Sequence, residues 1–158
     1  DCDERFAALS RELELKPHVN MAGWVPYDRL GETDAKAQIG LVALQPSGNN
    51  FGGLSNKVYS YMSCGQPVIV PDGSGTAELV RRFDCGIGVD ITQPAAIAEA
   101  IVKLARDSEL RKRLGGNGRR AVETELGWHK MEETLRRGYA QFCRPPLGPI
   151  EKEALARC

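Results

Sequence analysis

The sequence predicts an α/β fold, namely a Rossmann-like parallel sheet with helices on both faces. Two apolar runs of strand length, residues 39–44 and 68–70, contain no alternating polar residues, which is typical of strands buried on both faces of a parallel sheet. Segments with helical spacing of apolar residues alternate with these runs, as they do in βα units. With 158 residues, the chain has the length of one ordinary domain.

The N-terminal segment predicts a helix, a strand and a second helix. Residues 3–14 carry apolar side chains at helical spacing, and Pro17 ends that helix. Residues 19–25 alternate well enough to predict a short strand. Pro26 and Asp28 then offer the start of the second helix.

The alternation continues along the rest of the chain. Residues 45–53, which follow the strand 39–44, are so rich in turn formers that they predict a loop. The later predicted elements are, in order, a helix over 55–63, a strand over 68–70, a helix after 73–76, a strand over 87–89, a helix from Pro94, and helices around 108–125 and 129–143.

Two boundaries follow from this order. A doubly wound domain usually opens on a strand, whereas this chain opens on a helix, so we expect at least one upstream β-α unit to be missing. We therefore predict a partial domain, truncated at its N-terminus, over residues 1–143. The prolines after Arg144 predict a linker and a C-terminal tail over residues 144–158.

Composition excludes several classes of protein. Lys plus Arg and Asp plus Glu both number 21. This balance argues against a nucleic-acid partner, because proteins that bind phosphates of nucleic acids carry an excess of positive charge. No run of about 18 apolar residues predicts a membrane span. No two of the five cysteines are spaced as C-x-x-C, so we expect no metal site.

The segment from Gly52 carries the most chemical information. A loop leaves a buried strand and opens a helix near Leu54 and Ser55, where free amide groups and the positive helix end favour an anion. Gly52 and Gly53 permit a ligand to approach the backbone closely. Lys57, in the first turn, suits a neighbouring phosphate, and Ser60 follows one turn later. An ordinary loop-helix connection with a solvated Lys57 would carry the same residues.

The chain resembles the C-terminal donor-binding domain of the family-four retaining glycosyltransferases, which have the two-domain GT-B fold, and it is most similar to transferases of the capsule and colanic-acid type. The resemblance covers about residues 5–140. The segments that carry it, in the family's order, are VNMAGWV (19–25), IGLVALQP (39–46), KVYSYMSCGQPVI (57–69), GSGTAELV (73–80), GIGV (86–89), and LGGNGR (114–119) with Trp128.

The resemblance implies a glycosyltransferase that moves a sugar from a nucleotide diphosphate sugar, as substrate and without a cofactor, to a polysaccharide or lipid-linked acceptor. It implies that Trp24 and Val25 lie near the base and Ser60 near the ribose. The diphosphate is expected to face Gly53, Leu54 and Ser55, with Lys57 close by. The N-terminal domain would supply the acceptor side, so the fragment alone would be inactive. We expect a cytoplasmic location, with peripheral association at the inner face of the membrane.

Two departures from the family pattern keep alternatives open. The family usually has two glutamates eight positions apart, and Gly52 and Ser60 occupy their places. The segment from Ser55 to Ser60 resembles the same segment in a subgroup of the family that has serine in place of the second glutamate. This resemblance favours an active enzyme, whose catalytic residues the sequence does not identify. The alternatives are a non-catalytic remnant that binds a nucleotide or a partner, and a nucleotide-sugar 2-epimerase of the same fold.

Overall fold

The structure, a computed structural model, describes residues 2–15, 17–45 and 52–142. The chain divides into two units, residues 1–33 and 34–158, and each is described by itself. The predicted linker and tail lie outside the described residues. The predicted division of the chain after residue 143 therefore stays a prediction.

The N-terminal unit contains the two helices that the sequence predicts. Helix α1 covers Cys2–Glu12, and α2 covers Tyr27–Asp34, with its last residue in the second unit. Helix α2 has an acidic first turn, with Asp28, and buries none of its residues. Its formation therefore owes more to local start signals than to an apolar face.

The predicted strand over 19–25 is wrong, because the structure has no strand there. A turn precedes the segment instead: the amides of His18 and Val19 donate to the carbonyl oxygen of Leu15 at 2.8 and 2.9 Å. Gly23 then adopts a φ of 67°, in the left-handed region, which interrupts the period of two that a strand needs. An alternating pattern of side chains does not make a strand unless a neighbouring strand pairs with the backbone.

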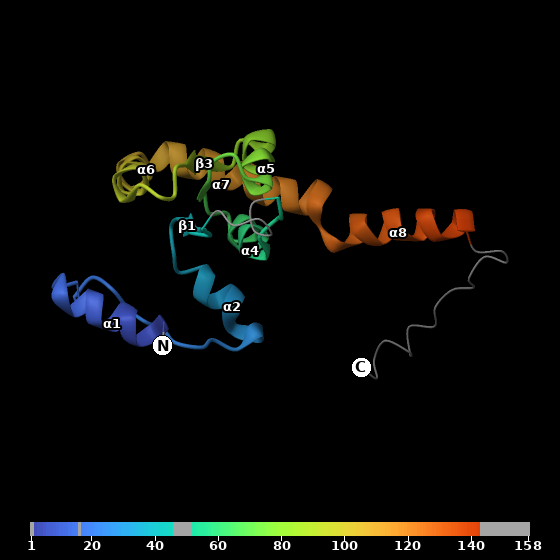
Figure 1. Cartoon of the computed structure of the whole chain (residues 1–158). Coiled ribbons are helices and arrows are strands. Elements are labelled where there is room, and N and C mark those ends of the chain that lie inside the picture. The colour runs from blue at the N-terminus through green and yellow to red at the C-terminus, as the bar shows by residue number, and fades with distance from the viewer. Residues whose placement is uncertain (1, 16, 46–51, 143–158) are drawn as a thin grey trace. The chain divides into compact units, whose positions relative to one another are not determined.

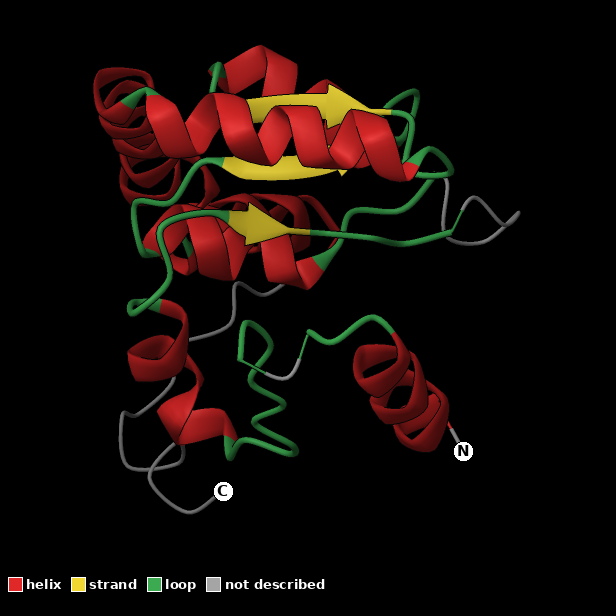
Figure 2. Ribbon diagram, turned by 90° about the vertical axis from the view of Figure 1, so that its left-hand side faces the viewer, coloured by secondary structure: helices red, strands yellow, loops and turns green. Residues whose placement is uncertain are grey.

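The second unit contains a three-stranded parallel sheet among its described residues (Figure 2). Strands β1 (Gly40–Leu41), β2 (Val68–Pro71) and β3 (Gly86–Val89) lie in the order β1-β2-β3. Both pairs are parallel, and β2 is central. The predicted parallel sheet is confirmed. Strand β1 is shorter than the predicted 39–44, although the Val42 amide still donates to Ile69 at 2.9 Å.

Helices follow the strands as predicted (Figure 1). None of the helices in the described part of the chain is long and apolar enough to cross a membrane. Pro94 lies in the first turn of its helix, as expected of a residue whose φ suits a helix start. The elements are α4 (Asn56–Ser63), α5 (Gly75–Phe83), α6 (Pro94–Arg106), α7 (Ser108–Ala121), the π-helical η1 (Val122–Leu126) and α8 (Trp128–Phe142).

The side chains of β2 point alternately to two hydrophobic clusters, so both faces of the sheet are covered. Val68 and Val70 pack in one cluster with residues of α4 and α5, such as Met62 and Val80. Ile69 packs in the other cluster, chiefly with residues of α6 and α7. All four residues of β2 are buried. The predicted arrangement, with helices on both faces of a buried strand, is confirmed.

Helix α7 lies directly on the end of α4 through glycines. A Cβ added at Gly115 would lie 2.0 Å from the carbonyl oxygen of Gly65, and one at Gly118 would lie 3.2 Å from Cγ of Met62. Gly65 itself has a φ of 72° and ends α4 as a left-handed cap. The glycine-rich segment 114–119 therefore serves close helix packing.

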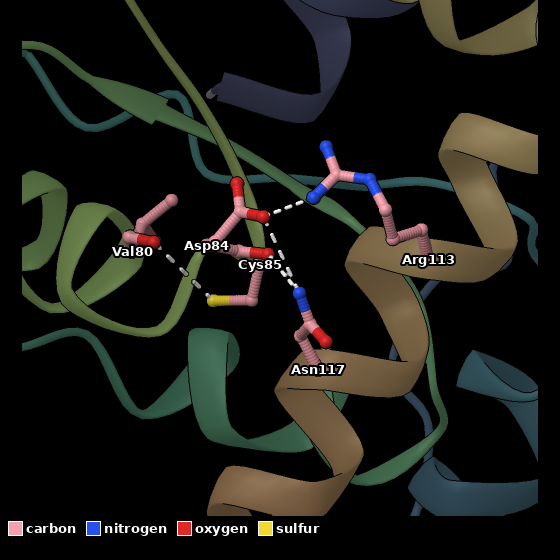
Figure 3. Close-up of polar contacts among 5 residues, drawn as sticks. All are labelled: Val80, Asp84, Cys85, Arg113 and Asn117. Carbon is pink, nitrogen blue, oxygen red and sulfur yellow. Dashed lines mark hydrogen bonds and ion pairs between the residues drawn. The ribbon is translucent and has the colours of Figure 1, made fainter.

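A polar cluster at the amino end of β3 completes this packing (Figure 3). Asp84 ends α5 in the left-handed region, with a φ of 45°. Its carboxylate pairs with Arg113, and Asn117 donates its side-chain amide to the Asp84 carbonyl oxygen at 2.9 Å. Cys85 is fully buried beside it, and burial raises the pKa of its thiol to about 11.

Candidate functional site

The carboxyl end of β2 is joined to α5 by a buried serine. Ser74 is 3% exposed. Its hydroxyl donates to the carbonyl oxygen of Pro71, the last residue of β2, at 2.6 Å. The Ser74 hydroxyl oxygen in addition accepts a hydrogen bond from the Ala77 amide at 3.1 Å, which caps the helix. One side chain therefore fixes the start of α5 against the end of the central strand.

The glycine loop before α4 lies against the first turn of α5. The Thr76 hydroxyl donates to the carbonyl oxygen of Gly53 at 3.2 Å and accepts from the Ser55 amide at 3.4 Å. A Cβ at Gly75 would lie only 2.9 Å from the carbonyl oxygen of Gly52. The starts of α4 and α5 therefore meet at the carboxyl edge of the sheet, the edge at which parallel α/β sheets bind ligands.

These two helix starts differ electrostatically. The start of α5 has its serine cap and an acidic residue, Glu78, in the first turn. The N-cap of α4 is Ser55, whose side chain makes no capping hydrogen bond, and the first turn of α4 contains no acidic residue. Lys57 lies in that turn and is exposed. The positive end of α4 therefore has no negative group of its own turn to offset it, and it suits an anion.

The structure brings six of the eight predicted site residues together in one unit. Gly52, Gly53 and Leu54 are exposed in the loop, and Ser55, Lys57 and Ser60 follow at the cap and along α4. Trp24 and Val25 belong to the N-terminal unit. Trp24 is 85% exposed. Their role beside a base stays a prediction.

Ser60 has a charged partner that the sequence did not indicate. Its hydroxyl donates to Oδ2 of Asp34 at 2.5 Å. Gln66 also holds Asp34, because its side-chain amide donates to the carbonyl oxygens of Asp34 and Ala37. A carboxylate therefore lies beside position 60, although no acidic residue occupies position 60 itself.

The Asp34 carboxylate also affects its surroundings on α4. Burial raises the pKa of the Tyr61 hydroxyl, and the negative charge of Asp34 raises it further. Burial and Asp34 likewise raise the pKa of the Cys64 thiol, against a smaller lowering effect of Arg119. Both shifts disfavour the ionised forms, so the two side chains lose their protons only at a pH above their ordinary range.

The sequence reasoning missed Ser74, Thr76 and Asp34. A serine directly before a helix is a recognisable N-cap signal. The sequence nevertheless identified Ser74 only as part of a turn before α5. Thr76 and Asp34 lie 21 and 26 residues from Ser55 and Ser60. No local pattern joins residues so far apart, and the sheet topology alone brings them together.

The described residues contain no group of three or more His, Cys, Asp or Glu side chains that could hold a metal ion. The groups at the carboxyl edge are instead backbone amides, a helix end and an exposed lysine. A serine paired with a carboxylate lies farther along α4. Such groups bind phosphate oxygens by donated hydrogen bonds and hydroxyl groups by accepted ones. The arrangement suits a phosphate ester that also carries hydroxyl groups.

Comparisons with known proteins agree with this arrangement. Residues 2–121 match the family described as glycosyl transferases group 1. Spore coat protein SA of Bacillus subtilis is 35% identical over 78 residues, which are 49% of this chain and 21% of that protein. The capsular polysaccharide biosynthesis glycosyltransferase CapM of Staphylococcus aureus is 34% identical over 82 residues, which are 52% of this chain and 22% of that protein.

A solved structure shows the same fold. Sucrose-phosphate synthase from Thermosynechococcus elongatus superposes with a TM-score of 0.76 at 24% identity, over 88% of this chain and 34% of that one. The chain thus spans about a fifth to a third of the length of these three proteins.

Proposed function

Because this chain belongs to the glycosyl transferases group 1 family, we propose that it supplies the donor-binding side of a glycosyltransferase. The donor is a nucleotide diphosphate sugar, bound as a substrate and without a further cofactor. The observation that carries the proposal is the start of α4. It lies at the carboxyl edge of a parallel sheet, beside the start of α5, with neither a side-chain cap nor an acidic first turn.

We place the diphosphate of the donor at Gly53, Leu54 and Ser55. The exposed glycine loop permits close approach to the backbone, and the amides at the helix start donate to phosphate oxygens. Lys57 adds a positive charge from the first turn. Gly52 lies where the family has its first acid, and its carbonyl oxygen contacts the turn at Gly75.

The chemistry follows from these contacts. In the transfer, the bond between the anomeric carbon and the diphosphate oxygen breaks, and an acceptor hydroxyl forms the new bond and loses its proton. Negative charge grows on the departing diphosphate. Amide donors and a helix dipole fixed at that point stabilise the growing charge without having to reorganise. This role needs a loop that is held in place before the donor arrives.

We place the ribose of the donor near Ser60. Its hydroxyl hydrogen is directed to Asp34, which leaves the Ser60 oxygen free to accept a hydrogen bond from a ribose hydroxyl. The neighbouring carboxylate offers a stronger acceptor, because hydrogen bonds to charged groups are about twice as strong as those between neutral groups. Trp24 and Val25 are proposed to contact the base, as the resemblance to the family implies.

The remaining parts of the enzyme are proposed from the relatives. An N-terminal domain of the same protein would supply the acceptor side, so this chain alone would be inactive. The name of the Staphylococcus aureus relative refers to capsular polysaccharide biosynthesis, which favours a polysaccharide or lipid-linked acceptor here. An acceptor of that kind fits a cytoplasmic enzyme that associates peripherally with the inner face of the membrane. No nucleic-acid partner is proposed.

A second candidate function is donor binding without transfer. The observation that favours it is the absence of an acid at Gly52 and Ser60, where the family has two glutamates. The Asp34 carboxylate beside Ser60 compensates for one of these acids and not for the other. The two functions therefore differ in turnover and not in the site that binds the donor.

The test uses the full-length protein. UDP-, GDP- and ADP-sugars are titrated by calorimetry, and the donor that binds is then incubated with an oligosaccharide or lipid-linked acceptor. We expect one base to be preferred and the labelled sugar to appear on the acceptor. Binding without transfer or donor hydrolysis would support the second candidate. If no nucleotide sugar binds, both functions are refuted.

A further inference from the structure

We propose that Thr76, aided by Gly75, is a positioning residue that holds the diphosphate-binding loop in place before the donor binds. This inference rests on the proposed function, since it assigns the loop of Gly53 and Ser55 to the diphosphate. Thr76 itself is not proposed to touch the donor. It acts through the backbone of the loop.

The Thr76 hydroxyl makes both of its contacts with the same short loop. It donates to the carbonyl oxygen of Gly53 at 3.2 Å and accepts from the Ser55 amide at 3.4 Å. The side chain is buried, with 3% of its surface exposed, so water competes poorly for these long hydrogen bonds. One hydroxyl therefore fixes the loop at two points, one on each side of Leu54.

Gly75 makes this contact sterically feasible. A Cβ at Gly75 would lie 2.9 Å from the carbonyl oxygen of Gly52 and 3.8 Å from that of Gly53. Contacts under 3.0 Å are too short for a real Cβ, so a side chain at this position would push the loop backbone away. The absence of a side chain lets the loop lie directly on the turn that carries Thr76.

The turn at Ser74 and Gly75 is itself fixed to the sheet. Ser74 donates to the carbonyl oxygen of Pro71 at 2.6 Å and caps α5 through the Ala77 amide. A continuous set of contacts therefore runs from the end of β2, through the buried Ser74 and Thr76, to the backbone of the loop. A loop held in this way meets the diphosphate without a further cost of ordering.

The role is tested with Thr76→Val, which keeps the volume and removes the hydroxyl, and with Thr76→Ser, which keeps the hydroxyl. Thr134→Val is the matched control, because the Thr134 hydroxyl donates to a backbone oxygen, that of Lys130, on the exposed surface of α8. The full-length proteins are titrated with UDP, GDP and ADP, and with uridine, guanosine and adenosine, which lack the diphosphate.

We expect Thr76→Val to weaken the binding of the preferred diphosphate about five- to tenfold, because binding must then order a loop that the Thr76 hydroxyl holds in the free wild type. The affinity for the matching nucleoside should not change, since the nucleoside does not reach the loop. Thr76→Ser should restore diphosphate binding to within about twofold of the wild type. Thr134→Val should leave both affinities unchanged. An unchanged diphosphate affinity in Thr76→Val, or an equal loss for both ligands, would overturn the inference.

A second measurement does not depend on any nucleotide. Hydrogen exchange of the peptide that covers residues 52–58 should be faster in Thr76→Val and in Gly75→Ala than in the wild type, and normal in Thr76→Ser. Unchanged exchange in both altered proteins would refute the positioning role. If the wild type binds none of the diphosphates while exchange responds as expected, the proposed function fails and the positioning of the loop by Thr76 stands.

Discussion

At the amino ends of β2 and β3, helix α7 approaches α4 so closely that a Cβ at Gly115 would lie 2.0 Å from a backbone oxygen. Asp84, Arg113 and Asn117 satisfy one another there. At the carboxyl end of β1, by contrast, α4 starts without a capping side chain, and its loop is exposed. Departures from local rules tend to mark functional positions. The comparison therefore separates an end of the sheet that stabilises the fold from an end at which we propose that the donor binds.

The largest effect is expected from Gly115→Ala at the amino end. Its methyl group would force α7 away from the Gly65 carbonyl oxygen, and such overpacking costs about 3 kcal/mol of unfolding free energy. Gly116→Ala is the matched control on the same helix, because an added Cβ there would meet no atom within 4 Å. That control should be neutral or slightly stabilising, since alanine favours a helix. Urea unfolding of the two full-length variants measures the difference. Equal stabilities would contradict the claim that close packing at Gly115 stabilises this end of the sheet.

The buried Cys85 thiol should make stability at the amino end depend on alkaline pH. Because the pKa in the fold, about 11, lies above the unfolded value near 9, the stabilisation is complete below pH 9. It decreases as pH rises from 9 to 11 and is lost above that range. The loss is about 2 kcal/mol by pH 10.5.

The measurement compares the wild type with Cys85→Ala by urea unfolding at pH 8 and at pH 10.5. The wild type should lose about 2 kcal/mol more than the variant between the two pH values. The subtraction removes the other groups that titrate in this range, such as the Tyr61 hydroxyl. A difference between the two proteins that is the same at both pH values would show that Cys85 titrates as it does in the unfolded chain.

Ser60→Ala tests the ligand-binding end of α4 more gently. Removal of the hydroxyl deletes the proposed neutral hydrogen bond to the ribose and also removes the partner of Asp34. We expect the donor to bind about 1 kcal/mol more weakly, with little change in unfolding. Donors with ribose and with 2′-deoxyribose distinguish the effect, because the loss should be smaller for the deoxy donor. An equal loss for both donors would place the ribose away from Ser60.

The smallest effects should come from the exposed polar contacts of the amino end. Asn117→Ala removes the hydrogen bond to the Asp84 carbonyl oxygen and should cost about 1 kcal/mol of unfolding free energy. Arg113→Ala removes an ion pair whose side chains are 55% and 59% exposed, so we expect a loss below about 0.5 kcal/mol. Thermal unfolding ranks the two variants, and a larger loss for Arg113→Ala would reverse the order.

Most of the fold was predictable because its signals are local. The continuous apolar run of β2 predicted a strand buried on both faces, and Pro94 marked a helix start. Residues 19–25 failed for a physical reason, since alternation describes a strand only when a neighbour pairs with it and Gly23 interrupts the extended backbone. The π-helical turn after α7 carries no local signal that we recognised.

The candidate site was predictable only in part. Gly53, Ser55 and Lys57 were found because they are consecutive features of one loop and one helix start. Thr76, which holds the loop, and Asp34, which places a negative charge beside Ser60, were not found because they come from other segments. Side chains brought together by a parallel sheet leave no spacing rule in the sequence. The sequence therefore identifies the site residues that lie in one loop and helix, whereas only the structure identifies those that come from other elements.

The central claim, that the exposed loop at the start of α4 binds the donor, is tested most directly by titrating the preferred nucleotide sugar against Gly53→Val in the full-length protein. A valine at this exposed position should block close approach of the diphosphate while the fold remains stable. We predict at least about a tenfold loss of affinity, the equivalent of one lost charge-assisted hydrogen bond, with an unfolding midpoint equal to that of the wild type. An unchanged affinity in Gly53→Val would contradict the account and place the nucleotide elsewhere.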